Sequence, residues 1–257
     1  MNSRPTRSLR HEYALYVEVE IENYKESIPR SVLLSIGDEA VSSLATQPQL
    51  ALTELLLCEE VDRIIFRRLR LPTYQTWRKR RVKVLEELRR PEHWGLRADD
   101  VLVRAFPQSG EGHMLLAGAD DEGSALYFAA NGCDVTAVSP EVEMLERVLD
   151  AAQRAGLSER VHGYVADLAS WMPERQLTGV IVSPAALAGL TPTQRARVIG
   201  LLQSATLDGG VHLVSTIANG KRALNVDELR TRYEGWMVSV EPSADKSTVF
   251  LARKELS

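Results

Sequence analysis

The stretch ALYFAANGCDVTAV, residues 125–138, decides the fold of this chain. It passes from an apolar, helix-like segment that ends near Ala130 to a run rich in β-branched residues at 134–138, which is typical of a strand. The same alternation continues to both sides of it. Strands that alternate with helices of about 10–15 residues are expected to form right-handed βαβ units and a parallel sheet with helices on both faces.

From His113 onward, the pattern predicts five strands and the helices that connect them. The expected strands are 114–117, 134–138, 161–165, 179–182 and 211–216, and the expected helices are 124–130, 141–155 and 194–204. A short helix at 227–233 then leads to two last strands, 236–240 and 248–252, with the turn-rich segment 242–246 between them. We expect these two strands to form an antiparallel hairpin at the edge of the sheet.

The first part of the chain is predicted to be helical. Apolar side chains recur at helical spacing in its first helix, at Tyr13, Val17, Ile21, Tyr24 and Ile28. Locally, residues 17–22 alternate as a strand would, but the longer period favours a helix. Further helices are expected at 31–44, 48–69 and 73–90, followed by a linker at 91–97.

Composition excludes several classes of protein. With 44% hydrophobic and 26% charged residues, the 257-residue chain is in the globular range. Its apolar runs are far shorter than the ~20 residues of a membrane-spanning helix, and no signal-peptide core follows Arg4 and Arg7. We therefore expect a cytoplasmic protein without membrane insertion. Cys58 and Cys133 form neither a disulfide framework nor a metal-binding spacing, and both are predicted to be buried.

Several stretches resemble class I S-adenosylmethionine (SAM) methyltransferases, and most of all those of the tellurite-resistance type. Residues 125–138 are similar to the passage from helix A to strand two in small-molecule methyltransferases, and 165–168 (VADL) to the end of strand three. Residues 207–210 (LDGG) resemble the turn before strand five, and 227–236 the helix before the final hairpin. The resemblance implies an α/β, Rossmann-like, mostly parallel sheet in a domain of residues 106–257, preceded by a helical segment of residues 1–105.

The resemblance also implies where SAM would bind. In this fold the cofactor lies at the carboxyl ends of the strands, where the strand order reverses. The candidate cofactor-binding residues at those ends are Gly118, Ser139, Asp167, Leu168 and Ser183. Asp167 corresponds to the family's aspartate that faces the adenine amino group, while Gly118 is the glycine of the first turn that permits close approach of the backbone.

The family's cofactor pattern is eroded in this chain. Its first turn (acid, Leu, Gly, Cys, Gly, any residue, Gly) falls on residues 116–122, LAGADDE, where only Gly118 is retained. Ser139 stands at the place of the acid that binds the ribose hydroxyls, and Gly179 near the acid that opens strand four. Residues 183–186, SPAA, replace those that customarily follow that strand.

The other polar residues either allow two interpretations or indicate no particular chemistry. Residues 120–122 (DDE) are either a site for a hard cation or a solvated acidic turn, and we favour the turn. Asp167 is either an adenine contact or a cap of the next turn. The five histidines lack paired metal spacing, so no metal is predicted, and no catalytic residue can be assigned.

Charge is distributed unevenly along the chain. Residues 1–105 carry a net charge of +2 and residues 106–257 one of −6, and the segment 63–83 has nine basic residues and no acidic one. Basic residues interleaved with Tyr74 and Trp77 are typical of nucleic-acid binding. The alternative, which we favour, is a helix in which aromatic and aliphatic side chains pack inward and the arginines pair with glutamates. The inward set is Tyr74, Trp77, Val84, Leu85 and Leu88, and the glutamates are Glu59, Glu60, Glu86 and Glu87.

Two functions are consistent with these patterns. The one we favour is a pseudoenzyme, a methyltransferase fold with an eroded SAM site that serves as a scaffold. Residues 48–90 would then contact a protein partner or form a homo-oligomer. The other is an active SAM-dependent methyltransferase that acts on a small molecule or a partner protein, chiefly by positioning the reactants. A nucleic-acid-associated protein that binds through residues 63–83 is a further alternative.

Overall fold

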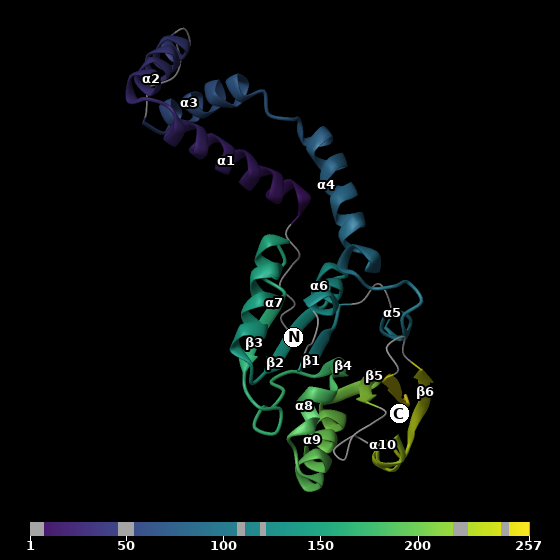
Figure 1. The fold of residues 1–257 in the computed structure, drawn as a ribbon. Coiled ribbons are helices and arrows are strands. Elements are labelled where there is room, and N and C mark those ends of the chain that lie inside the picture. Colours follow the sequence, from purple (N-terminus) through teal and green to yellow (C-terminus); the bar gives the residue numbers. More distant parts are fainter. Residues whose placement is uncertain are drawn as a thin grey trace. The chain divides into compact units, whose positions relative to one another are not determined.

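The structure is a computed structural model that describes residues 8–45, 54–106, 111–118, 122–217, 226–242 and 247–256 (Figure 1). The chain forms two compact units, Met1–Val84 and Leu85–Ser257. Each unit has a hydrophobic core of its own. The two units therefore divide within the fourth helix, while the boundary expected at residues 105 and 106 stays a prediction. Among the described residues, no helix is both long and apolar enough to cross a bilayer.

The first unit is helical, as predicted. Its helices are α1 (Leu9–Ser27), α2 (Arg30–Ala45), α3 (Glu54–Leu69) and the first part of α4 (Tyr74–Leu88). The core of the unit consists of Ile21, Ile36, Ala40, Ile64 and Ile65, which come from α1, α2 and α3. The strand-like alternation at 17–22 thus lies in a helix, and residues 48–53 of the expected third helix lie outside the described residues.

Glu60 is a buried carboxylate that joins α2 to α3. It is 3% exposed, and its Oε1 atom accepts hydrogen bonds from Ser43 Oγ (3.1 Å) and Arg67 Nη2 (3.3 Å). Its Oε2 atom accepts one from Arg63 Nη1 (2.6 Å). A buried charge is costly unless it is paired and hydrogen-bonded, and Glu60 meets both conditions.

The second unit is built on a mostly parallel sheet with a C-terminal antiparallel hairpin, which confirms the predicted fold class. Within the described residues the sheet has seven strands in the order β3-β2-β1-β4-β5-β7-β6. The strands are β1 (His113–Ala117), β2 (Asp134–Ser139), β3 (Val161–Val165), β4 (Leu177–Val182), β5 (Thr206–Ile217), β6 (Trp236–Pro242) and β7 (Ser247–Lys254). The first five are parallel, while β7 runs antiparallel to both β5 and β6.

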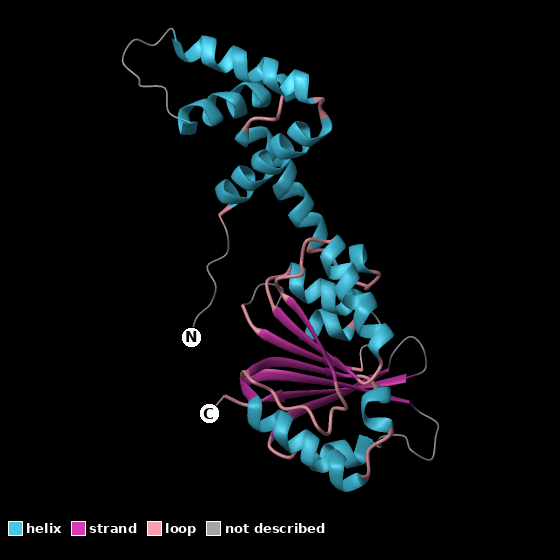
Figure 2. Cartoon of the chain, turned by 90° about the vertical axis from the view of Figure 1, so that its left-hand side faces the viewer, coloured by secondary structure: helices cyan, strands magenta, loops and turns pink. Residues whose placement is uncertain are grey.

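Helices cover both faces of the sheet (Figures 1 and 2). The helical segments of this unit after α4 are η1 (Pro91–Trp94), α5 (Val101–Ala105), α6 (Glu122–Ala130), α7 (Val142–Arg154), α8 (Pro184–Ala188), α9 (Pro192–Ala205) and α10 (Val226–Arg232). Side chains from α5, α6 and α7 form one core with the sheet. Those from α8, α9 and α10 form a second core on its other face. Successive residues of a strand therefore enter different cores, as Leu116 and Ala117 of β1 do.

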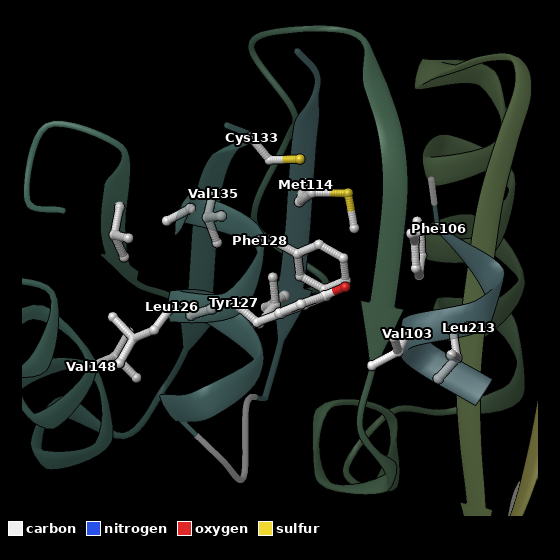
Figure 3. Close-up of a cluster of buried hydrophobic side chains, with 14 of the residues drawn as sticks. Val103, Phe106, Met114, Leu126, Tyr127, Phe128, Cys133, Val135, Val148 and Leu213 are labelled. Carbon is white, nitrogen blue, oxygen red and sulfur yellow. The ribbon is translucent and has the colours of Figure 1, made fainter. Parts of the chain in front are cut away.

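The segment expected as a linker at 91–97 is instead packed structure. Trp94 lies in η1, contacts the first core and donates a hydrogen bond from Nε1 to the Leu88 carbonyl (2.6 Å). Further on, Phe106 stacks edge-on against Phe128 at 5.1 Å between ring centroids (Figure 3). A side chain at Gly179 would collide with the Phe106 ring, so the glycine in β4 permits this packing.

Two further expectations need correction. Residues 207–210 do not precede strand five but form an irregularity inside β5, because Thr206 already pairs with Leu177 before the register shifts. Cys58 is exposed, because it lies on a side of α3 that does not face the core of the first unit. Cys133 is buried as predicted, and burial raises the pKa of its thiol to about 11.

Candidate cofactor site

The candidate residues are arranged along one edge of the sheet. The strand order reverses between β1 and β4, which are neighbours in the sheet but not in the sequence. Gly118 follows β1, Ser139 ends β2, Asp167 lies just after β3 and Ser183 follows β4. In doubly wound α/β proteins, ligands bind at such a reversal, at the carboxyl ends of the strands. The structure thus places the predicted residues on the expected edge.

Backbone hydrogen bonds continue beyond the strand ends and fix this edge. The Gly118 N–H donates to the Val138 carbonyl (2.8 Å), and the Ser183 N–H donates to the Ala117 carbonyl (3.0 Å). Next to them, the Ala166 N–H donates to the Ser139 carbonyl (3.1 Å). Backbone hydrogen bonds of the sheet therefore hold the ends of the four strands in register.

Gly118 is required by both its backbone and its surroundings. Its φ is +62°, in the left-handed region that favours glycine. A Cβ atom added there would lie 2.6 Å from Ser183 Oγ and 3.0 Å from both Cβ and N of Ala186. The first turn of α8 therefore lies directly against Gly118, a contact that the sequence patterns did not indicate.

Ser183 contributes a buried hydroxyl that no described residue binds. The residue is 9% exposed, and its Oγ atom has no hydrogen-bond partner among the described residues. It stands at the N-cap of α8, but its side chain makes no capping hydrogen bond. A buried polar group without a partner typically costs about 1–3 kcal/mol. The hydroxyl is therefore free to bind a ligand atom.

The Ser139 hydroxyl is hydrogen-bonded within its own loop. It is 3% exposed, and its Oγ atom accepts a hydrogen bond from the Glu141 N–H at 3.1 Å. The residue at the position expected for a ribose-binding acid is thus a neutral, buried hydroxyl that already has a donor. It cannot supply the negative charge that the resemblance implies for this position.

Asp167 and Leu168 differ in environment. Asp167 is exposed, and no hydrogen bond joins its carboxylate to another described residue. The following turn is closed by the Asp167 carbonyl, which accepts hydrogen bonds from the backbone N–H groups of Ser170 (2.9 Å) and Trp171 (3.2 Å). Its side chain therefore does not act as the cap that was the alternative. Leu168 is buried in the second core, beside the edge.

The acidic stretch at 120–122 is described only in part. Asp120 and Asp121 lie outside the described residues. Glu122 is exposed and begins α6, where a carboxylate is stabilised by the helix dipole. Leu116, which stands where the family pattern has an acid, is buried in the first core under α6. No carboxylate is therefore available at this position to meet a ligand.

The comparisons with known proteins support the fold. No family model matches the chain, and neither does any curated protein. Among solved structures it is similar to the tellurite-resistance methyltransferase TehB from Haemophilus influenzae, with 15% identity and a TM-score of 0.53 over 64% of this chain and 65% of that one. It is also similar to the N-methyltransferase NodS from Bradyrhizobium japonicum WM9, with 15% identity and a TM-score of 0.50 over 60% of this chain and 93% of that one.

These similarities concern the fold of the chain and not its activity. The chain spans slightly less than two thirds of the length of TehB, and the identity is low in both cases. They confirm the class I methyltransferase fold that residues 125–138 and the later stretches predicted. The activity of this chain has to be argued from its own site.

Proposed function

We propose that this protein binds SAM or S-adenosylhomocysteine (SAH) weakly at the carboxyl edge of β1–β4, and that it serves mainly as a methyltransferase-fold scaffold. Ser139 is the observation that carries the proposal. Where a carboxylate would accept the ribose hydroxyls, this chain has a neutral hydroxyl that is buried and already bonded to the Glu141 N–H. A binding site of this kind lacks its strongest acceptor.

The remaining residues fit a weakly held cofactor. Gly118 allows the backbone to approach a ligand, Ser183 offers an unused hydroxyl, and Asp167 has an unengaged carboxylate for the adenine amino group. When bound, SAM supplies a methyl group activated by its sulfonium. The chain itself would position that group, since methyl transfer needs no protein nucleophile.

The expected loss of SAM affinity can be estimated from the missing carboxylate at position 139. One hydrogen bond to a charged acceptor contributes about 1–3 kcal/mol, which corresponds to roughly one to two orders of magnitude in Kd. We therefore expect SAM binding in the high micromolar range or weaker. Calorimetric titration of the full chain with SAM and with SAH measures this directly, and a Kd in the low micromolar range or below would contradict the proposal.

A matched pair of variants tests the role of residue 139. In Ser139→Asp, one carboxylate oxygen can keep the Glu141 N–H bond while the other faces the ribose hydroxyls. Ser139→Asn is the control, because it has a similar shape and can also accept that hydrogen bond, but carries no charge. We expect the Asp variant to bind SAM about tenfold more tightly than the native chain, and the Asn variant to bind like the native chain. Equal affinities in all three would exclude residue 139 from the site.

A second candidate is an active methyltransferase acting on a small molecule or a partner protein. The juxtaposition of Gly118 with the unpartnered Ser183 hydroxyl favours it, because a pure scaffold has no need of a buried unsatisfied group. Transfer of a labelled methyl group from SAM to a panel of amines, thiols and cellular protein would establish this function. If neither the native chain nor the Ser139→Asp variant transfers the methyl group, this candidate fails and the scaffold function is the proposal that stands.

The scaffold role also predicts a partner for the helical unit. A protein or a second copy that meets residues 48–90 stays a proposal, and of that range the structure describes 54–90. Sedimentation of the full chain at increasing concentration tests self-association. We keep the cytoplasm as the expected location.

A further inference from the structure

The basic residues of the helical unit fall into two classes. Four of the nine between residues 63 and 83 have acidic partners within the unit. The pairs are Arg63 and Arg67 with Glu60, Arg68 with Glu39, and Arg81 with Glu12. The first three belong to α3, so that on α4 before Leu85 only Arg81 is paired with another described residue.

The other cations of α4 before Leu85 have no acidic partner in the part of the chain that the structure describes. Arg78, Lys79, Arg80 and Lys83 are exposed, and none forms an ion pair or side-chain hydrogen bond with another described residue. We call these four residues the α4 ridge. The glutamates expected to pair with them are engaged elsewhere or unpaired among the described residues. Glu60 binds the arginines of α3, and Glu87 pairs with Arg90 at 3.3 Å. The favoured expectation is therefore confirmed for Arg63 and Arg67, which pair with Glu60, and wrong for Arg78 and Arg80 among the described residues.

The aromatic residues of α4 contact α1. Trp77 is in contact with Tyr13 (5.4 Å between ring centroids) and stacked on Tyr16 (6.1 Å), and Tyr74 meets Tyr13 edge-on at 5.5 Å. They hold α4 against α1, as predicted for inward-facing residues, although Val84 of the same set is 49% exposed. At about 100° per residue, the four cations of the ridge lie roughly 60–160° around the helix from Trp77.

We propose that the α4 ridge binds the phosphate backbone of a nucleic acid without reading its sequence. Its four cations lie within six successive residues of one helix, and the helix rises about 6 Å from Lys79 to Lys83. A DNA strand presents a phosphate about every 3.4 Å along its axis. The ridge can therefore meet several phosphates at once. The proposal concerns the helical unit and does not depend on whether SAM binds.

The composition of the ridge favours this ligand over a protein. The exposed side chains between Gln75 and Lys83 are all polar or charged, whereas protein interfaces draw their affinity from buried aromatic and apolar anchors. Because Tyr74 and Trp77 are engaged with α1, they are not presented as a platform for stacked bases. We therefore expect single and double strands to bind with affinities within about fivefold of each other, since stacking on unpaired bases would add about 1–3 kcal/mol per base.

The test is fluorescence anisotropy of the full chain with labelled nucleic acids of about 20 nucleotides, one single-stranded and one double-stranded, over a series of salt concentrations. About four phosphate contacts predict that log K falls against log salt with a slope of roughly 3–4. The quadruple variant Arg78→Gln, Lys79→Gln, Arg80→Gln, Lys83→Gln should bind at least about tenfold more weakly, with a slope near zero.

A control variant removes the same charge from the other unit. Arg147, Arg197, Arg230 and Arg232 are exposed, and none forms an ion pair with another described residue. Their joint replacement by Gln should leave binding within about twofold of the native value. Circular dichroism of both variants establishes that they are folded.

Three results would overturn the proposal. The first is no binding by the native chain at low salt, and the second is equal weakening in the ridge variant and the control. The third is competition by poly-glutamate as effective as that of unlabelled duplex at equal charge, which would assign the ridge to acidic proteins instead.

Discussion

His212 in β5 and Ser183 after the neighbouring β4 are both buried, yet the fold treats their polar atoms in opposite ways. The His212 ring bonds to Thr206 Oγ1 through Nε2 (2.7 Å) and to the Tyr233 hydroxyl through Nδ1 (2.7 Å). Ser183 Oγ has no partner among the described residues. The polar atoms of His212 are fully hydrogen-bonded inside the second core, which they stabilise. The Ser183 hydroxyl lies at the edge of the sheet where a ligand would bind.

The hydrogen bonds around His212 also fix its tautomer. Thr206 Oγ1 donates its single proton to the Leu202 carbonyl at 2.6 Å. Nε2 of His212 must therefore donate to Thr206, which leaves Nδ1 to accept from the Tyr233 hydroxyl. With the ring neutral, both ring nitrogens of His212 and the hydroxyls of Thr206 and Tyr233 are hydrogen-bonded. Burial accordingly lowers the pKa of His212 to about 3, with a smaller contribution from Lys254.

Removing the closed network should have the largest effect. We expect His212→Ala to lower the free energy of unfolding by about 3–5 kcal/mol, because it leaves a cavity, takes the acceptor from the buried Tyr233 hydroxyl and removes the donor to Thr206 Oγ1. Urea denaturation at pH 7 measures it. His162→Ala on the exposed side of β3 is the control and should change stability by less than about 0.5 kcal/mol. A loss below about 1 kcal/mol in His212→Ala would show that the network does not hold the core.

At the open edge, the crowding around Gly118 can be separated from its backbone conformation. Gly118 and Gly156 have similar positive φ angles, +62° and +70°, but a Cβ at Gly156 would meet no atom within 4 Å. We expect Gly156→Ala to cost about 1 kcal/mol from backbone strain alone. Gly118→Ala should cost about 2–3 kcal/mol, because Ser183 and Ala186 must also move, and it should abolish any SAM binding. Equal losses of stability in the two variants would mean that Ser183 and Ala186 move away from a Cβ atom at residue 118 without a cost in free energy.

The neutral state of His212 makes stability depend on pH. The pKa of His212 is about 3 in the folded chain and 6.5 in the unfolded chain. Between these two pH values the unfolded state binds a proton at this residue and the folded state does not. The stabilisation is complete above pH 6.5 and declines as the pH falls towards 3. Between pH 7 and pH 5 the loss should be about 2 kcal/mol. In His212→Leu this contribution should vanish, and an unchanged pH dependence there would assign it to other groups.

The parts of the fold that could be predicted are those that local pattern determines. The passage from α6 to β2 at residues 125–138 carries a helix and a β-branched strand in one stretch, and the final hairpin is marked by its turn residues. The packed segment at 91–97 resembles a linker in the sequence because it is too short to show a period. Trp94 and Leu96 were the signal that could have identified it.

The candidate site could be predicted only up to the strand ends. Gly118 and Ser183 follow from the positions of β1 and β4, since every parallel strand ends at the same edge. The approach of Ala186 to Gly118, and the hydrogen bond that occupies Ser139, depend on the path of loops, and no periodicity records such paths. The sites at 120 and 121 lie outside the described residues, so the acidic turn stays a prediction.

The smallest expected effect concerns one hydroxyl in each region, that of Thr206 in the closed network and that of Ser183 at the open edge. Thr206→Val removes a hydroxyl that has two partners and should cost about 1–2 kcal/mol. Ser183→Ala removes one that has none among the described residues, so the free energy of unfolding should stay the same or rise by up to about 1 kcal/mol. If the hydroxyl instead serves a ligand, the same variant should bind SAM up to about tenfold more weakly while being no less stable. Loss of stability in Ser183→Ala equal to that in Thr206→Val would make Ser183 part of the fold, and the two regions would no longer differ.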